Sequence, residues 1–129
     1  MKVIDSSALI KYVAKEENWE TVETHIKEGC KTLELAIKET ANALAKKTLK
    51  NEVTVELSKE IIAHLPKIVK IAPQTEQIPK ALEIAAKHKI TIYDALFIAL
   101  AVNTSQQLLT SDKKQAGISE KYVTTILIL

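Results

Sequence analysis

The sequence has no arginine, and all eighteen of its basic residues are lysines. A site built from this chain therefore lacks bidentate guanidinium clamps and offers phosphate groups only lysine point charges. The single cysteine, Cys30, excludes an internal disulfide and any zinc site made from several cysteines. Only two glycines occur among the 129 residues, so there is no glycine-rich phosphate loop. P-loop and dinucleotide-binding sites are excluded on that ground.

Long apolar runs are also missing. The longest purely apolar stretch, Ala95 to Val102, is far too short to span a bilayer. Three prolines and two glycines argue against long linkers or disorder, and the N-terminus reaches Asp5 with no room for a signal peptide. The net charge of +2 does not by itself indicate a nucleic-acid partner. We expect one soluble, cytoplasmic domain covering residues 1–129.

Short apolar segments alternate with amphipathic helical segments along the chain. Strands are predicted at 2–4, 68–71, 107–110 and 124–128, and helices at 7–15, 18–27, 35–49, 55–65, 75–88 and 92–103, with a short helix after Asp112. Gly29 is expected to cap the second helix, and Pro66 to lie beyond the end of the fourth. The pattern predicts an α/β fold: a parallel sheet flanked by helices on both faces.

Aspartate is scarce as well, since the sixteen acidic residues include only Asp5, Asp94 and Asp112. Each lies beside an apolar run and close to small hydroxyl residues, whereas the glutamates are mostly scattered through lysine-rich helical segments. Asp5 and Asp112 follow predicted strands, and ligands of parallel sheets gather beyond the carboxyl ends of strands. A short carboxylate at the edge of a core suits a divalent-metal site.

Each aspartate also has a purely structural explanation. Asp5 and Asp112 could be N-caps of the helices that follow them, although the neighbouring serines could cap equally well. The segment Thr91-Ile-Tyr-Asp94 fits a capping box, in which the acid reaches back to the cap residue. Taken singly, capping and function explain each residue about equally well.

Helical spacing favours a functional role for Asp94. Phe97 and Ile98 follow it by three and four residues, which predicts that Asp94 lies on an apolar face. An unpaired carboxylate there is costly unless it meets hydrogen bonds or a cation. Glu39 is the one glutamate with the same feature, because apolar residues surround it at helical spacing, and Asn42 lies one turn further on.

Four converging carboxylates repel one another unless a cation joins them. Mg²⁺ or Mn²⁺ fits a set of oxygen ligands, whereas zinc prefers histidine and cysteine. His25, His64 and His88 lie in lysine- or glutamate-rich segments and are expected at the surface or at helix ends. No serine–histidine or cysteine–histidine pair is apparent, so metal-assisted hydrolysis of a phosphate diester is the chemistry that remains.

Four segments, in matching order over the full chain, resemble the PIN-domain ribonucleases, and most closely the VapC-type toxins of toxin–antitoxin pairs. The segments are Val-Ile-Asp5-Ser-Ser-Ala-Leu-Ile, Lys-Glu39-Thr-Ala-Asn42-Ala-Leu, Thr-Ile-Tyr-Asp94-Ala-Leu-Phe-Ile-Ala-Leu-Ala and Leu-Leu-Thr110-Ser-Asp112-Lys-Lys. The resemblance implies a single PIN-like domain with about five parallel strands.

The resemblance further implies that the acids bind one or two Mg²⁺ or Mn²⁺ ions and cleave RNA endonucleolytically. The implied catalytic and metal-binding residues are Asp5, Glu39, Asp94 and Asp112, with Ser7, Asn42 and Thr110 in support. It also implies a homodimer and a small antitoxin partner. Because arginine is absent, the lysines nearest the acids could contact the RNA backbone or the antitoxin instead: Lys11, Lys15, Lys113 and Lys114.

Two other functions remain open. One is a nuclease of the same fold and chemistry that serves housekeeping RNA processing or decay. The other is a non-catalytic PIN-like module that binds RNA or a protein without turnover. The presence of all four acids argues against the second, while the near-neutral charge and the missing arginine keep it open.

Overall fold

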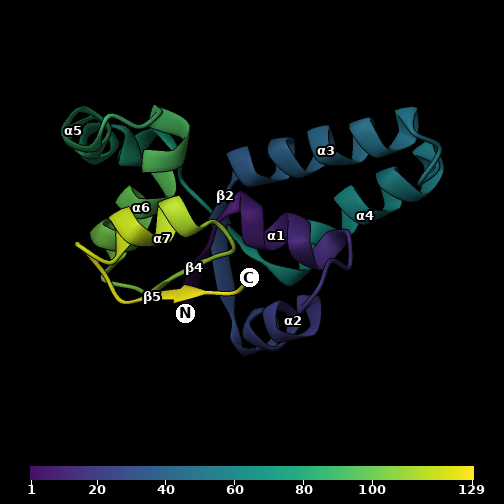
Figure 1. Cartoon of the computed structure of the whole chain (residues 1–129), viewed down its shortest axis with the longest axis horizontal. Coiled ribbons are helices and arrows are strands. Elements are labelled where there is room, and N and C mark those ends of the chain that lie inside the picture. The colour runs from purple at the N-terminus through teal and green to yellow at the C-terminus, as the bar shows by residue number, and fades with distance from the viewer.

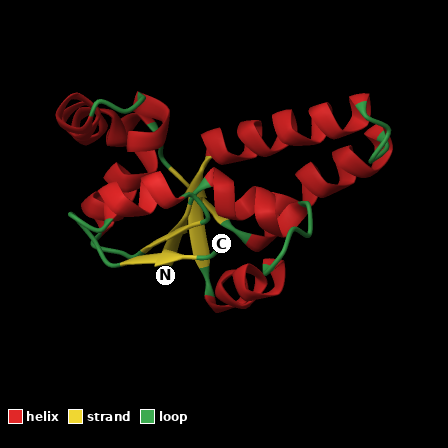
Figure 2. Ribbon diagram, viewed as in Figure 1, coloured by secondary structure: helices red, strands yellow, loops and turns green.

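A five-stranded parallel sheet forms the centre of the computed structural model, which describes residues 1–129 (Figures 1 and 2). The elements in chain order are β1 (Lys2–Ile4), α1 (Ser6–Val13), α2 (Trp19–Glu28), β2 (Cys30–Leu33), α3 (Glu34–Leu49), α4 (Val55–Ile68), β3 (Lys70–Ala72), the 3-10 turn η1 (Thr75–Gln77), α5 (Ile78–His88), α6 (Ile92–Thr104), β4 (Leu108–Thr110), α7 (Lys113–Ser119) and β5 (Thr125–Leu127). None of the helices combines the length and the apolar character needed to cross a membrane.

The strand order is β3-β2-β1-β4-β5, so the chain moves in one direction from β1 to β3 and in the other from β4 to β5. Right-handed crossovers then place α1–α4 on one face of the sheet and α5–α7 on the other. Figure 1 shows this division, with α1–α4 to the right of the sheet and α5–α7 to the left. The predicted α/β fold, with helices on both faces, is confirmed.

The core lies where these two helical layers meet the strands. Val3 and Ile4 of β1 and Leu108 and Leu109 of β4 are fully buried, because both strands are covered on both faces. Helix α6 is buried along its whole middle, at every residue from 95 to 101. Continuous burial explains why this segment is apolar all round rather than along a single stripe.

The elements differ from the sequence prediction at three places. The strand predicted at 68–71 lies at Lys70–Ala72, because α4 continues to Ile68. Strand β2 was not predicted, because Lys31 and Thr32 interrupt its apolar pattern; the pairing with β1 and β3 on either side fixes it as a strand. The prediction that Pro66 lies beyond the end of a helix was wrong, since α4 continues to Ile68. Proline costs the helix one amide donor, and here that loss falls in the last turn, on the exposed side.

Candidate functional site

The switch in strand order falls between β1 and β4, and it decides where a site can form. Adjacent strands there send their chains to opposite faces of the sheet, which opens a crevice beyond the strand carboxyl ends. Asp5 follows β1 directly, and Asp112 follows β4 by two residues. The sheet topology therefore brings together two acids that are 107 positions apart in the sequence.

Asp5 is a buried carboxylate, with only 4% of the residue exposed. It is the N-cap of α1, and its Oδ1 accepts a hydrogen bond from the Ala8 amide at 3.1 Å and one from Ser7 Oγ at 2.7 Å. Its Oδ2 accepts one from Thr110 Oγ1 of β4. Asp5 thus caps α1 and also lies in the candidate site. The hydroxyls of Ser7 and Thr110 fix the orientation of its carboxylate.

Burial raises the pKa of the Asp5 carboxyl to about 6, because the charged form loses its hydration. The hydrogen bonds from Thr110, Ser7 and Ala8 act in the opposite direction, since they favour the charged form. The negative charge of Asp112 adds to the increase. Because this carboxylate is both buried and close to another acid, a cation bound beside it would stabilise its charged form.

Asp112 is exposed and is the N-cap of α7. Its Oδ1 accepts hydrogen bonds from the amides of Lys114 at 2.8 Å and Gln115 at 3.1 Å, and its own amide donates to Thr110 Oγ1 at 3.1 Å. Thr110 therefore links Asp112 to Asp5 directly. No hydrogen bond within the chain engages Asp112 Oδ2, so that oxygen remains available to a ligand.

Glu39 on α3 is half-buried and accepts a 2.6 Å hydrogen bond from Ser6 Oγ on α1. Ser6, considered from the sequence only as an alternative cap, instead donates a hydrogen bond to Glu39. The prediction that Glu39 lies on the inward side of its helix agrees with this packing. Asn42 is exposed and makes no hydrogen bond with Glu39, so the structure does not bring it into the network.

Asp94 is exposed, and the prediction that it lies on an apolar face was wrong. Residues 95–101 of α6 are buried all round, so the spacing to Phe97 and Ile98 does not define a direction for Asp94. Its amide donates to the N-cap Thr91 at 3.2 Å, and its carbonyl accepts from Gln115 Nε2 at 2.8 Å. Its carboxylate makes no hydrogen bond with the chain and is free.

Hydrogen bonds join Asp5 to Asp112 through Thr110, and Asp112 to the Asp94 carbonyl through Gln115, whereas Glu39 is bonded only to Ser6. No group of three or more histidine, cysteine, aspartate or glutamate side chains is close enough to hold a metal ion on its own. Mg²⁺ keeps several water ligands and needs only one or two direct carboxylates. The donors present are carboxylate and hydroxyl oxygens, and free oxygens remain on Asp94 and Asp112, which suits a hydrated hard cation and not zinc.

The lysines predicted to contact a polyanion are not equally available. Lys11 is buried, and its Nζ donates to the Glu17 carbonyl at 2.9 Å, so its assignment as a contact residue was wrong. The loop that follows α1 covers the Lys11 side chain. Lys113 and Lys114 are exposed in the first turn of α7, beside Asp112. Lys15 is exposed but lies over the Trp19 ring, 5.5 Å from its centroid.

The three histidines lie outside the acidic edge. His25 and His88 are in the last turns of α2 and α5, as expected of helix-end residues. His88 also hydrogen-bonds Tyr122 at 2.7 Å. His64 is exposed on α4. None of the three contacts an acid of the site.

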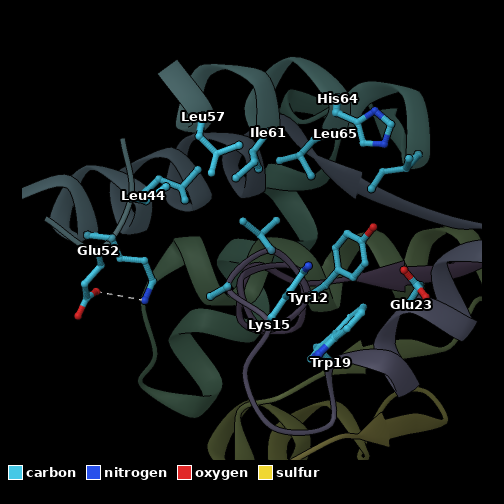
Figure 3. Close-up of a pocket in the computed structure, with 15 residues that line it drawn as sticks. Tyr12, Lys15, Trp19, Glu23, Leu44, Glu52, Leu57, Ile61, His64 and Leu65 are labelled. Carbon is cyan, nitrogen blue, oxygen red and sulfur yellow. Dashed lines mark ion pairs between the residues drawn. The ribbon is translucent and has the colours of Figure 1, made fainter. Parts of the chain in front are cut away.

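An open groove of about 780 Å³ lies on the α1–α4 side of the molecule (Figure 3). Leu57, Ile61 and Leu65 project into it from α4, and Tyr12 and Trp19 face them from α1 and α2. Ten of its fifteen lining residues are hydrophobic, and a Lys47–Glu52 ion pair of 3.6 Å lies at one rim. None of the four acids lines it, so the groove is separate from the acidic edge.

Sequence reasoning missed two residues of the network, Ser6 and Gln115. The signal for Gln115 was present, because an acid followed by glutamine three residues later has the spacing of a capping box. No sequence signal identified Ser6, whose bond to Glu39 spans 33 residues and depends on the packing of α1 against α3.

Comparisons with known proteins agree on one family. The family described as PIN domain matches residues 2–121. Ribonuclease VapC3 of Pyrobaculum aerophilum is 33% identical over 119 residues, which cover 88% of this chain and 91% of the relative. The crystal structure of PAE2754 from the same organism is similar, with a TM-score of 0.76 at 22% identity, covering 96% of this chain and 87% of that one. FitAcB from Neisseria gonorrhoeae has a TM-score of 0.58 at 14% identity, covering 98% and 96%.

Proposed function

This chain belongs to the PIN-domain family, and from that premise we propose that it is a metal-dependent endoribonuclease that hydrolyses RNA phosphodiesters at its acidic edge. The observation that carries the proposal is the hydrogen-bonded set Asp5–Thr110–Asp112 at the topological switch point of the sheet. The name of the relative Ribonuclease VapC3 supports the same chemistry.

The catalytic and metal-binding residues in this proposal are Asp5, Glu39, Asp94 and Asp112, with Mg²⁺ or Mn²⁺ as the ion. Ser7 and Thr110 orient the Asp5 carboxylate, and Ser6 orients Glu39. When bound, the ion lowers the pKa of a water and stabilises the charge that develops on the phosphate. Asn42 has no supporting contact in this arrangement.

The substrate contacts follow from what is exposed at this edge. Lys113 and Lys114 are exposed in the first turn of α7, directly after Asp112 in the chain, and bring two positive charges to this edge. Lysine acts on phosphate as a point charge, so these residues attract the RNA backbone without reading its sequence. Tyr93, next to Asp94 and 58% exposed, presents a ring on which a base could stack.

The proposed biological role is the toxin of a toxin–antitoxin pair, held inactive by a small antitoxin. Similarity to Ribonuclease VapC3 over most of both chains supports this role. The apolar groove between α1, α2, α3 and α4 is the surface where we place the antitoxin, because an exposed apolar concavity suits the apolar face of a partner helix. A homodimer is proposed on the same family grounds.

Two alternatives are kept. A housekeeping RNA-processing nuclease would use the same site and differ in having no antitoxin. A non-catalytic RNA- or protein-binding module is favoured by one observation, that no three acids close on a common metal position.

Removal of divalent metal is expected to abolish RNA cleavage. Purified protein should cut a mixed structured RNA in Mg²⁺ or Mn²⁺, and EDTA should stop the reaction, because the four acids cannot by themselves supply a nucleophile at neutral pH. Gel analysis of the fragments after metal is added back in excess checks that the loss is reversible. Cleavage that continues in EDTA would contradict the metal-dependent mechanism.

Leu57→Glu is expected to weaken antitoxin binding by about 30-fold or more, the cost of losing a central apolar contact. Leu57 lines the groove and is 48% exposed, so the change should leave the fold intact. Titration calorimetry with the antitoxin, which we expect to be a small protein encoded beside the gene, measures the effect. Leu82→Glu, at an exposed leucine of α5 outside the groove, is the matched control. Equal losses in the two variants would assign the partner to another surface.

A further inference from the structure

Gln115 is a buried polar residue of α7 that has no role in the chemistry described above. Only 5% of it is exposed. A carboxamide in such a place is costly unless its donors and acceptors find partners. The contacts that Gln115 makes therefore bear directly on why this position is polar.

Its place in the helix predicts a contact that it does not make. Asp112 is the N-cap of α7 and Gln115 is the third helical residue, which is the arrangement of a capping box. In that motif the glutamine side chain would accept a hydrogen bond from the amide of the cap residue. Here the Asp112 amide donates to Thr110 Oγ1 instead, at 3.1 Å. Because Thr110 accepts the hydrogen bond of the Asp112 amide, the Gln115 side chain does not act as a cap.

The Gln115 side chain connects two helices. Gln115 Nε2 donates to the Asp94 carbonyl on α6 at 2.8 Å, while the Gln115 amide donates to Asp112 Oδ1 at 3.1 Å. No other hydrogen bond joins α6 to α7. Gln115 therefore contacts both exposed aspartates: its side chain binds the main-chain carbonyl of Asp94, and its amide, together with the Lys114 amide, binds Asp112 Oδ1.

We propose that Gln115 is a positioning residue that sets the separation of Asp94 and Asp112 and thereby favours Mg²⁺ over larger divalent ions. The inference rests on the proposed function, because it assumes that these two acids are ligands. Mg²⁺ demands near-ideal octahedral geometry, whereas Ca²⁺ accepts flexible arrangements and longer bonds. A fixed connection between two ligands therefore matters more for Mg²⁺ than for Ca²⁺.

Gln115→Met tests this role, because methionine matches the length of glutamine and lacks its donor and acceptor. Calorimetric titration of the metal-free protein with Mg²⁺ and, separately, with Ca²⁺ gives the two affinities without any RNA. We expect Mg²⁺ binding to weaken by about 10-fold, the lower end of the loss caused by removing a group that supports a metal ligand, because Gln115 binds the main-chain carbonyl of Asp94 and not its carboxylate. Ca²⁺ binding should weaken by less than about threefold, because Ca²⁺ tolerates the looser spacing.

Gln77→Met is the matched control. Gln77 is also 5% exposed, and its Nε2 also donates to a backbone carbonyl, that of Pro73 at 3.0 Å. It belongs to η1 and makes no contact with the acids, so its loss should leave the ratio of the two affinities unchanged. A general loosening of the fold would affect the two variants alike.

The possible outcomes distinguish a failure of the positioning role of Gln115 from a failure of the proposed metal-dependent function. Equal weakening of both ions in Gln115→Met, or the same change of ratio in Gln77→Met, overturns the positioning role and leaves the metal site standing. A wild-type protein that binds neither ion overturns the metal site and the role of Gln115 with it. If Gln115→Met does not fold, Gln115→Asn replaces it, since that side chain keeps the amide but is one methylene shorter, and the same loss is expected.

Discussion

Asp94→Asn is expected to lower the rate of RNA cleavage by at least about 100-fold, which corresponds to about 3 kcal/mol of lost transition-state stabilisation. Asparagine keeps the size of the side chain and removes the charge that a divalent ion requires. The fold should survive, because both hydrogen bonds made by Asp94 use backbone atoms, its amide to Thr91 and its carbonyl to Gln115. Rates with Mg²⁺ at saturating RNA measure the effect.

Glu56→Gln is the matched control for this substitution. Glu56 is an exposed acid in the first turn of α4, so its loss removes the same favourable charge near a helix N-terminus without touching the acidic edge. Cleavage by Glu56→Gln should equal that of the wild type. Undiminished cleavage by Asp94→Asn, purified in the same way, would mean that the activity comes from a contaminant or that Asp94 has no part in it.

Asp5→Asn is expected to gain stability relative to the wild type as the pH rises, in the metal-free protein. The folded-state pKa of Asp5 is about 6, above its ordinary value of 3.8, mainly because of burial. The folded state therefore binds the proton more tightly than the unfolded state. The stability that Asp5 contributes is fully present below pH 3.8 and is lost as the pH rises through 6.

Linkage between these two pKa values predicts that the stability gap between Asp5→Asn and wild type grows by about 2 kcal/mol from pH 4 to pH 7. Denaturant unfolding of both proteins at each pH, in EDTA, measures the gap, and pH effects of other groups cancel in the difference. Glu60→Gln, at an exposed acid of α4, should show a constant gap of less than about 0.5 kcal/mol. A constant gap for Asp5→Asn as well would show that its carboxyl titrates normally.

Adding Mg²⁺ gives a second arm to the same experiment. An ion that binds only the folded protein stabilises it by mass action. The wild type should therefore gain stability at pH 7, where the buried Asp5 carboxylate is charged, and Asp5→Asn should gain much less.

Most of the secondary structure could be predicted from local pattern, because periodicity and breakers act within a few residues. The helix of α3 and the strand β1 followed from composition and apolar runs alone. Strand β2 could not be predicted, since its polar Lys31 and Thr32 fit a strand only between two partners. Pro66 misled the prediction because a helix can lose one amide in its last turn without ending there.

The sequence by itself determined which residues could do chemistry. Metal-assisted chemistry at acidic residues was predicted from four features: scarce aspartate at the ends of apolar runs, a single cysteine, two glycines and no arginine. Four segments in matching order indicated the family. Each of those features depends only on composition or on residues that are neighbours in the chain, so the sequence is enough to identify it.

Only the tertiary structure decided how those residues are held. The switch in strand order placed Asp5 beside Thr110 and Asp112, burial raised the pKa of Asp5, and the packing of α1 on α3 joined Ser6 to Glu39. Tertiary packing also buried Lys11, which had been predicted from the sequence as a possible phosphate contact. Each of these depends on contacts between distant segments, and the free energy of burial or of a hydrogen bond is set by the surroundings, which local sequence does not specify.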